Sequence, residues 1–237
     1  MQLVNIKATT LPDAWYQCLY NCVDKGRKFK IDSGSYAGQE RLEFDYITIQ
    51  IKYSCMRPLL PQIPEQYNIP NPVTEEYLND YVSYLMTAEK KENESYTYGS
   101  RLCNSTFIDE NNVYSFLDQI QYVIDSYKTK GHRNNQNVMQ IGLPEDLLLD
   151  DPACLRHIDT RIQDNKLHFF VYFRSWDLFG GMPANLAAIQ ILKEYMGQEI
   201  GVEDGEIIAS SKGLHLYDHY WHIAEILRGR NNLTRGW

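Results

Sequence analysis

The residues whose chemistry could serve a reaction are concentrated between positions 151 and 217. Cys154 follows the triplet Asp-Pro-Ala, and Arg174 and Ser175 come twenty and twenty-one positions later. A cysteine attacks as its thiolate, and a nearby guanidinium lowers the thiol pKa from about 8.5. A planar guanidinium beside a hydroxyl also suits a phosphate group. These residues therefore predict a nucleophile beside an anion-binding pair.

A second set of polar residues could hold a base and its sugar. The amide of Asn185 carries both a donor and an acceptor, which match the N3–H and O4 groups of uracil. A carboxylate at that position would instead suit cytosine, whose exocyclic amine donates. His215 and Tyr217 stand two apart on an expected strand, so both side chains could reach one sugar hydroxyl. The set predicts a site for a pyrimidine nucleotide.

Each of these signals has a plainer interpretation when it is taken alone. A lone cysteine is most often a small buried hydrophobic residue. An Arg-Ser pair commonly ends a surface strand, and an asparagine in the first turn of a helix commonly bonds the backbone. A His-x-Tyr pair commonly packs in a core. The functional interpretation therefore depends on the fold bringing these residues together.

A hairpin is expected to bring the cysteine and the arginine together. Hydrophobic residues predict strands over 155–162 and 167–174, joined by a turn at Asp164 and Asn165. The second strand would then return its end to the residue that precedes the first. The arginine at that end would lie beside the thiol.

Hydrophobic spacing and capping residues predict the rest of the architecture. The expected helices span 10–24, 75–87, 113–128, 184–196 and 220–228, and the expected strands span 42–53, 138–141 and 207–215. A proline-rich stretch over 57–72 indicates an extended surface connection, and 229–237 is a polar tail. Small residues over 32–38, after a basic stretch, could form an anion-binding loop or an ordinary solvated one. Without a βαβ rhythm, we expect a single α+β domain over 1–237 with a mixed, mostly antiparallel sheet.

Composition excludes several classes of protein. A net charge of −8 over 237 residues argues against a DNA-binding protein. No apolar run reaches membrane length and no signal-like segment follows Met1, so we expect no membrane partner. Five irregularly spaced cysteines are typical of a reducing compartment, which indicates the cytoplasm. Cys18 and Cys22 form at most half of a metal site, so they are expected to be buried thiols and no metal is predicted.

The order and spacing of these residues resemble the thymidylate synthase family. The matching pattern is Pro152-x-Cys154, Arg174-Ser175-x-Asp177, Gly181-x-Pro183-x-Asn185 and His215-x-Tyr217. Upstream, Tyr98-Gly99 and Asp118-Gln119-Ile120 also resemble family motifs. Residues 96–228 are most similar to the short archaeal-type branch, whereas the N-terminal third matches loosely.

The resemblance implies reductive methylation of dUMP to dTMP, with 5,10-methylenetetrahydrofolate or a related methylene pterin giving carbon and hydride. The implied roles are attack on C6 by Cys154, phosphate binding by Arg174 and Ser175, base orientation by Asn185, sugar binding by His215 and Tyr217, folate contact by Asp177 and proton removal through Tyr98. It also implies a homodimer whose sheets pack face to face, with helices on the other face. Phosphate-binding arginines are expected from the partner subunit and from an N-terminal loop, for which Arg133 and Arg27 are the candidates.

This chain departs from the family pattern at several positions. Leu155 stands where the family usually has histidine, and Ala184 where it usually has phenylalanine. Asn134 follows Arg133, where the family usually has a second arginine. Twenty residues follow Tyr217, where the family continues to a lid over the folate. The usual catalytic glutamate and folate-stacking tryptophan have no placed counterpart in the proline-rich stretch.

Two other functions remain open at this point. A pyrimidine-nucleotide hydroxymethylase, acting on dUMP, dCMP or CMP, would share the cysteine attack but add water in place of hydride. Asn185 disfavours a dCMP enzyme because it matches uracil. A non-catalytic nucleotide- or RNA-binding homologue would keep the pocket without turnover, and the intact Cys154 argues against it.

Overall fold

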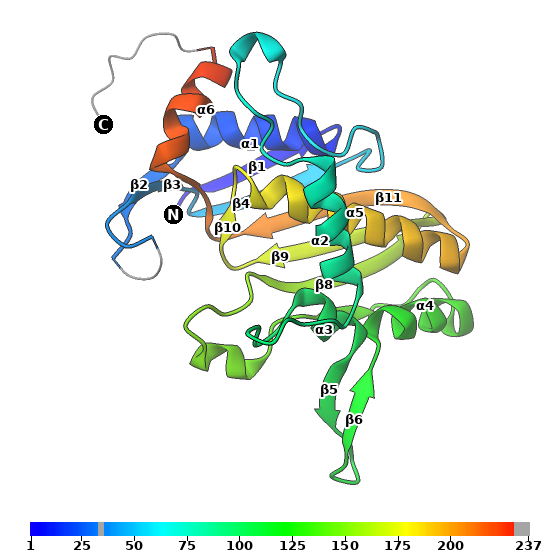
Figure 1. Ribbon diagram of the computed structural model, residues 1–237. Helices are drawn as coiled ribbons and strands as arrows, with labels where there is room; N and C mark the ends of the chain where they lie inside the picture. The colour runs from blue at the N-terminus through cyan, green and yellow to red at the C-terminus, as the bar shows by residue number, and fades with distance from the viewer. Residues whose placement is uncertain (33–35, 230–237) are drawn as a thin grey trace.

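A six-stranded mixed sheet forms the centre of the computed structural model, which describes residues 1–32 and 36–229 (Figure 1). Its strand order is β1-β4-β11-β9-β8-β7. The strands are β1 (Leu3–Ala8), β4 (Tyr46–Ile51), β7 (Val138–Gln140), β8 (Leu155–Gln163), β9 (Lys166–Phe173) and β11 (Glu203–Ser211). The β1/β4 and β9/β11 pairs are parallel and the other pairs are antiparallel. The expected mixed sheet of an α+β fold is confirmed.

Two smaller β-structures flank the central sheet. One sheet has the order β10-β12-β3-β2 and contains β10 (Trp176–Asp177), β12 (Leu214–Tyr217), β3 (Glu40–Glu43) and β2 (Arg27–Lys30). The other is an antiparallel ribbon of β5 (Ser105–Ile108) and β6 (Tyr114–Leu117), which projects from the body of the molecule (Figure 1).

Helices cover one face of the central sheet. They are α1 (Leu11–Lys25), α2 (Glu75–Met86), α3 (Tyr98–Cys103), α4 (Gln119–Lys130), α5 (Gly181–Ile200) and α6 (Trp221–Leu227). Helix α5 packs on β9 and β11, and α1 and α2 pack against α5 (Figure 1). Side chains of β4 alternate accordingly, with Ile47, Ile49 and Ile51 fully buried beneath the helices.

The opposite side of this sheet, here called the open face, carries side chains that are only partly buried. It is formed by Tyr46, Thr48 and Gln50 of β4, Ile208 and Ser210 of β11, His168, Phe170 and Tyr172 of β9, and His157 and Asp159 of β8. Phe170 lies near its middle, opposite Ile208 on one side and Asp159 on the other. Aromatic and aliphatic groups therefore gather on a face that no helix covers among the described residues.

Local signals predicted several elements well. Thr10 and Thr74 cap α1 and α2, each accepting a backbone N–H in the first turn. The hairpin expected at Asp164 and Asn165 is present, and both residues adopt left-handed φ values, 53° and 59°, as a two-residue hairpin turn requires. Cys18 and Cys22 are buried on α1, and burial raises the pKa of the Cys18 thiol. These thiols contribute to the core.

Three predicted elements differ from the structure. The helix expected over 113–128 is wrong in its first part, because 114–117 pairs as β6, and α4 begins only after Asp118, whose side chain accepts from the Gln121 N–H at 2.9 Å. The strand expected over 42–53 is divided between β3 and β4, which lie in different sheets. The strand expected over 207–215 is likewise divided, into β11 and β12.

Parts of two predicted segments lie outside the described residues. These are positions 33–35 of the small-residue loop and positions 230–237 of the polar tail. Within 1–32 and 36–229, no helix combines the length and the apolar character that crossing a membrane requires.

Candidate active site

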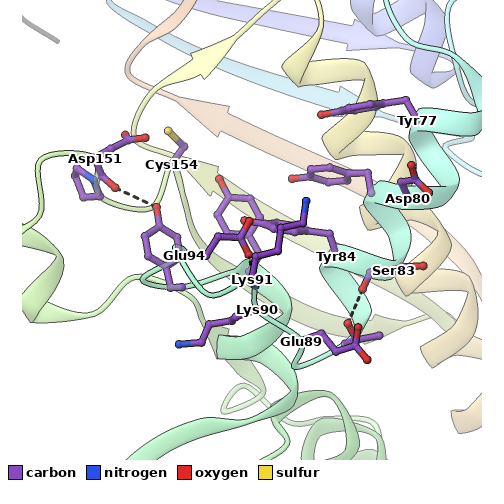
Figure 2. A pocket seen from close by; sticks show the side chains of 15 residues that line it. Tyr77, Asp80, Ser83, Tyr84, Glu89, Lys90, Lys91, Glu94, Asp151 and Cys154 are labelled. Carbon is purple, nitrogen blue, oxygen red and sulfur yellow. Dashed lines mark hydrogen bonds between the residues drawn. The ribbon is translucent and has the colours of Figure 1, made fainter. Parts of the chain in front are cut away.

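A cavity of about 810 Å³ lies between helix α2 and the loop that ends at Cys154 (Figure 2). Its far wall is a row of aromatic rings on one face of α2, formed by Tyr77, Tyr81 and Tyr84. Their ring centroids are 6.2 and 5.6 Å apart, and the neighbouring rings are stacked. No motif in the sequence points to these tyrosines, although their spacing of four and three residues places them on one helix face.

The β8–β9 hairpin brings Cys154 and Arg174 together. Cys154 directly precedes β8, and its carbonyl accepts the backbone N–H of Arg174 at 2.8 Å. The Arg174 guanidinium then folds back onto the loop. Its Nε donates to the Ala153 carbonyl at 3.2 Å, and an Nη donates to the Pro152 carbonyl and, at 3.3 Å, to the Asp151 carboxylate. The guanidinium therefore holds the loop that carries the thiol.

The thiol of Cys154 is half-buried, and this controls its ionisation. Burial raises the pKa of the thiol, whereas the charge of Arg174 lowers it, Asp151 raises it and Arg156 lowers it. The net direction is upward. The expectation of a thiol with a lowered pKa is therefore wrong for the protein without substrate, because the loss of solvation outweighs the neighbouring positive charges.

Tyr98 contacts the strand that follows the nucleophile. Its hydroxyl accepts the backbone N–H of Leu155 at 3.3 Å, and burial followed by the nearby Cys154 raises its pKa. The next residue, Gly99, lies against α2, where a Cβ would collide with the carbonyl oxygens of Tyr84 and Thr87. The absence of a side chain at Gly99 thus lets α3 approach α2 and sets Tyr98 beside the thiol.

Both ends of the Asn185 amide are engaged within the protein. Its Oδ1 accepts the indole N–H of Trp176 at 2.8 Å, and its Nδ2 donates to the Tyr81 hydroxyl at 2.6 Å. Asn185 is half-buried, in the first turns of α5. Through Tyr81 it reaches the same cavity as Cys154. An amide keeps one N–H and one lone pair in addition to these two bonds.

Asp177 and Ser175 lie on the connection between β9 and α5. The Asp177 carboxylate accepts the backbone N–H groups of Phe179, Gly180 and Gly181 at 3.2, 3.0 and 2.8 Å. The carboxylate therefore stabilises the chain entering α5. The resemblance implied a folate contact for Asp177 and did not predict this structural role. Ser175 precedes β10, and its Cα lies close to Gly213.

His215 is buried on β12 with one ring nitrogen bonded and one available. Its Nδ1 lies 2.9 Å from the Gly213 carbonyl, while its Nε2 has no hydrogen-bond partner among the described residues. Burial lowers the pKa of His215, so the ring is neutral near pH 7. A carbonyl can only accept, so Nδ1 carries the proton and Nε2 is left as an acceptor.

Tyr217 extends the same strand. Its ring packs edge-on against His215, with centroids 4.8 Å apart, and stacks on Tyr36 at 4.5 Å. Burial, followed by the influence of Tyr36, raises the pKa of Tyr217 to about 12. The phenol therefore keeps its proton and can donate or accept a hydrogen bond.

Of the predicted site residues, Cys154 and Tyr98 line the cavity. The others lie outside its lining, namely Arg174, Ser175, Asp177, Asn185, His215, Tyr217, Arg133 and Arg27. Arg27 lies on β2, where its side chain is 60% exposed and pairs with Asp45 at 2.9 Å. Arg133 lies exposed on the connection between α4 and β7. Within one chain, neither arginine joins the group around Cys154.

An ion network that the sequence analysis missed lies behind the nucleophile. Asp146 is buried and accepts two hydrogen bonds from Arg101, at 2.5 and 2.9 Å, and one from Arg156 at 2.6 Å. Burial by itself raises the pKa of Asp146, but the bonds from Arg101, the Leu143 N–H and Arg156 outweigh it and hold the pKa at about 2. Two arginines share one carboxylate, so the network keeps a net positive charge close to the thiol.

In the part of the chain that the structure describes, no group of three or more His, Cys, Asp or Glu side chains is arranged to hold a metal ion. The site therefore consists of a half-buried thiol, an arginine beside it, an oriented amide and a row of aromatic rings on an α+β scaffold. These groups have the chemistry that nucleophilic attack on a planar, anionic substrate would need.

Comparison with known proteins gives the family. The family model described as thymidylate synthase matches residues 71–234, and the chain belongs to the thymidylate synthase family. A Methanosarcina mazei protein named "Putative thymidylate synthase" is 32% identical over 227 residues, covering 95% of each chain. A Methanothermobacter thermautotrophicus protein of the same name is 24% identical over 230 residues, covering 93% of this chain and 96% of that one. A thymidylate synthase of Vesicomyosocius okutanii is 30% identical over 116 residues, covering 48% of this chain and 43% of that one.

Proposed function

We propose that the protein is a thymidylate synthase that converts dUMP to dTMP with a methylene-pterin co-substrate, as a cytoplasmic homodimer. The observation that carries this proposal is an aromatic cavity lined by Cys154, in a chain of this family. Arg174 is joined to Cys154 through the β8–β9 hairpin, and Asn185 is joined to the cavity wall through Tyr81. No single motif in the sequence is as specific as this arrangement.

The carbon C5 of uracil is a poor nucleophile, so the reaction needs a protein nucleophile that adds to the ring and activates C5. The thiolate of Cys154 adds to C6 of dUMP, and the electron pair of the C5–C6 bond moves toward O4 to form an enolate. C5 then attacks the methylene carbon of the co-substrate and loses its proton. The tetrahydropterin leaves, its hydride reduces the new exocyclic methylene, and the thiolate departs to give dTMP and dihydrofolate.

The proposed binding roles follow from the groups available. Arg174 and Ser175 bind the 5′-phosphate, and Asn185 bonds N3–H and O4 of uracil. His215, with its free Nε2 acceptor, and Tyr217 bind the 3′-hydroxyl. Phosphate binding would withdraw the Arg174 guanidinium from the Asp151 carboxylate, which lies 3.3 Å away, and bring a stronger anion to it.

The row of tyrosines on α2 is proposed to hold the co-substrate. Stacked phenol rings match a planar pterin, because aromatic systems attract through offset stacking. Lys90 and Lys91 line the same cavity and would pair with carboxylates of a folate tail. Tyr98 would relay the C5 proton. Asp177 is proposed to assist folate binding indirectly. Its carboxylate orders the backbone that enters α5, and that backbone would contact the folate.

The open face supports a homodimer. Phe170, Tyr172 and Ile208 are apolar groups on a sheet surface that the described helices leave uncovered. Packing against the same face of a second copy would bury them. In such a dimer Arg133 would be offered to the partner's phosphate site, and Arg27 would approach the phosphate of its own chain.

The test is release of tritium from dUMP labelled at C5, in the presence of methylenetetrahydrofolate. The proposal expects release that is matched by formation of dihydrofolate and dTMP. Cys154→Ala is expected to abolish both. Release that persists in this variant, or dUMP that binds without any release, would contradict the proposed function.

The same assay separates the hydroxymethylase. Water addition would give hydroxymethyl-dUMP and tetrahydrofolate, whereas reductive methylation gives dihydrofolate. Tritium release without formation of dihydrofolate would therefore contradict reductive methylation and identify the protein as a hydroxymethylase.

A further inference from the structure

We propose that Trp176 determines which pyrimidine the site accepts, by fixing the orientation of the Asn185 amide. The inference rests on the proposed nucleotide site and adds a positioning residue to it. Trp176 and Tyr81 both bond Asn185, although they lie 9 and 104 residues away from it in the chain.

The two bonds differ in what they can enforce. An indole N–H can only donate, so the oxygen of the Asn185 amide must face it, at 2.8 Å. The Tyr81 hydroxyl accepts the amide N–H at 2.6 Å, but a hydroxyl can equally donate to a carbonyl. Tyr81 would therefore satisfy either orientation of the amide, and Trp176 would satisfy only one.

The indole is itself held firmly in place. Its ring stacks on Phe173, with centroids 4.1 Å apart and planes 3° from parallel, and the residue is only 2% exposed. Its backbone N–H donates to Gly213 at 2.9 Å. Rotating the Asn185 amide by half a turn would set two donors against each other at a buried position. An unsatisfied buried donor disfavours such a state by roughly one to two orders of magnitude.

A fixed amide presents its remaining groups in one order. The second lone pair of Oδ1 and the second hydrogen of Nδ2 form an acceptor–donor pair. Uracil offers N3–H and O4, which are complementary to that order, whereas cytosine offers N3 and an exocyclic N–H in the reverse order. The orientation of the Asn185 amide therefore decides which of the two bases the site accepts.

The experiment compares the dissociation constants of dUMP and dCMP by calorimetry, for the wild-type protein and two variants. Trp176→Phe keeps the stacked ring and removes the N–H. Tyr81→Phe removes the other bond to the same amide and is the matched control. We expect Trp176→Phe to lower the preference for dUMP over dCMP at least tenfold, and Tyr81→Phe to leave that ratio within about threefold while weakening both ligands.

Several outcomes would overturn the inference. An unchanged preference in Trp176→Phe, or an equal loss in both variants, would contradict a role for the indole. Wild-type protein that binds neither nucleotide would overturn the proposed function together with this inference. Wild-type protein that binds both nucleotides equally would overturn the inference alone.

A measurement on the wild-type protein tests the inference even if the Trp176→Phe variant does not fold. In ¹⁵N-labelled protein, the Trp176 indole N–H is identified by its contacts with the Phe173 ring. We expect dUMP to slow exchange of this proton with solvent and dCMP not to slow it. Faster exchange with dUMP would mean that the base breaks the bond, which contradicts the inference.

Discussion

The backbone N–H of Arg174 donates to the carbonyl of Cys154 at 2.8 Å, so one strand pair holds both the thiol and the charge beside it. The side chain of Arg174 then reaches Asp151 at 3.3 Å. The thiol therefore lies between a cation that lowers its pKa and an anion that raises it, in a half-buried site that raises it further. Substitution of either charged residue shifts this balance in a known direction.

The first prediction concerns ionisation of Cys154. Arg174→Gln removes the cation, so the thiol pKa should rise above its already raised value and alkylation by iodoacetamide at pH 8 should slow several-fold. Each pKa unit changes the thiolate fraction about tenfold below the pKa. The midpoint of the rate against pH gives the pKa directly.

Asp151→Asn is the opposing control. It removes the carboxylate that raises the thiol pKa and should move the midpoint to lower pH. If both variants moved the midpoint in the same direction, the changes would reflect the loop and not the charges.

A second prediction concerns the free acceptor on His215. Replacement by phenylalanine, whose ring offers no acceptor, should raise KM for dUMP about tenfold, the effect of one lost hydrogen bond, and change kcat less than about threefold. Because the ring is already neutral, this effect should persist from pH 7 to pH 8.

The hydroxyl partner can be removed from the ligand instead of the protein. The 2′,3′-dideoxy analogue of dUMP should bind more weakly than dUMP to the wild-type protein but equally to wild type and His215→Phe. A further loss of affinity for the analogue in the variant would place His215 against another part of the nucleotide.

A third prediction concerns the open face. Phe170→Glu would bury a charge near its middle, opposite Ile208, and should raise the dimer dissociation constant at least about a hundredfold. Sedimentation equilibrium should then give the mass of one chain.

Phe116→Glu provides the control, since Phe116 is a similar ring, 67% exposed on the projecting β5–β6 ribbon. It should leave the mass unchanged. If Phe116→Glu dissociated the dimer and Phe170→Glu did not, the subunit interface would lie on the ribbon and not on the open face.

A fourth prediction concerns the buried carboxylate of Asp146. Asp146→Asn leaves Arg101 and Arg156 without their anion and should lower the free energy of unfolding by about 3–5 kcal/mol. The pKa of Asp146 is about 2 when folded, against an ordinary value of about 3.9. Its stabilisation is therefore complete above about pH 4 and is lost as the pH falls toward 2.

Urea unfolding of both proteins across this range provides the measurement. The difference between wild type and Asp146→Asn should shrink as the pH falls from 4 to 2. Glu40→Gln, which breaks an exposed pair with Lys28, should cost less than about 1 kcal/mol. A difference for Asp146→Asn that is constant with pH would argue against the ion network as its source.

Local chemistry made part of this fold predictable. The hairpin turn at Asp164 and Asn165 and the caps at Thr10 and Thr74 each depend on a few neighbouring residues. That turn also fixed the pairing of Cys154 with Arg174.

Other features depend on distant partners. Asn185 and Tyr81 are 104 residues apart, and no spacing rule predicts their bond. Phe116 continues the helical spacing of Ile120 and Val123, yet 114–117 pairs with β5 and the helix begins only after its cap at Asp118. The half-burial that raises the Cys154 pKa is likewise a property of the assembled site.

The strand after the nucleophile changes phase at its second residue. Leu155 pairs with Phe173 and His157 with Tyr172, so Arg156 is one residue more than the partner strand contains. Deleting Arg156 would restore a regular ladder with Leu155 still opposite Phe173 and His157 still opposite Tyr172, so no side chain beyond it would change face. The deletion would instead remove the Arg156 side chain, which donates to Asp146 at 2.6 Å and to the Ala153 carbonyl at 3.2 Å. The extra residue thus gives the loop before the strand a second cationic tie without disturbing the pairing of the strands.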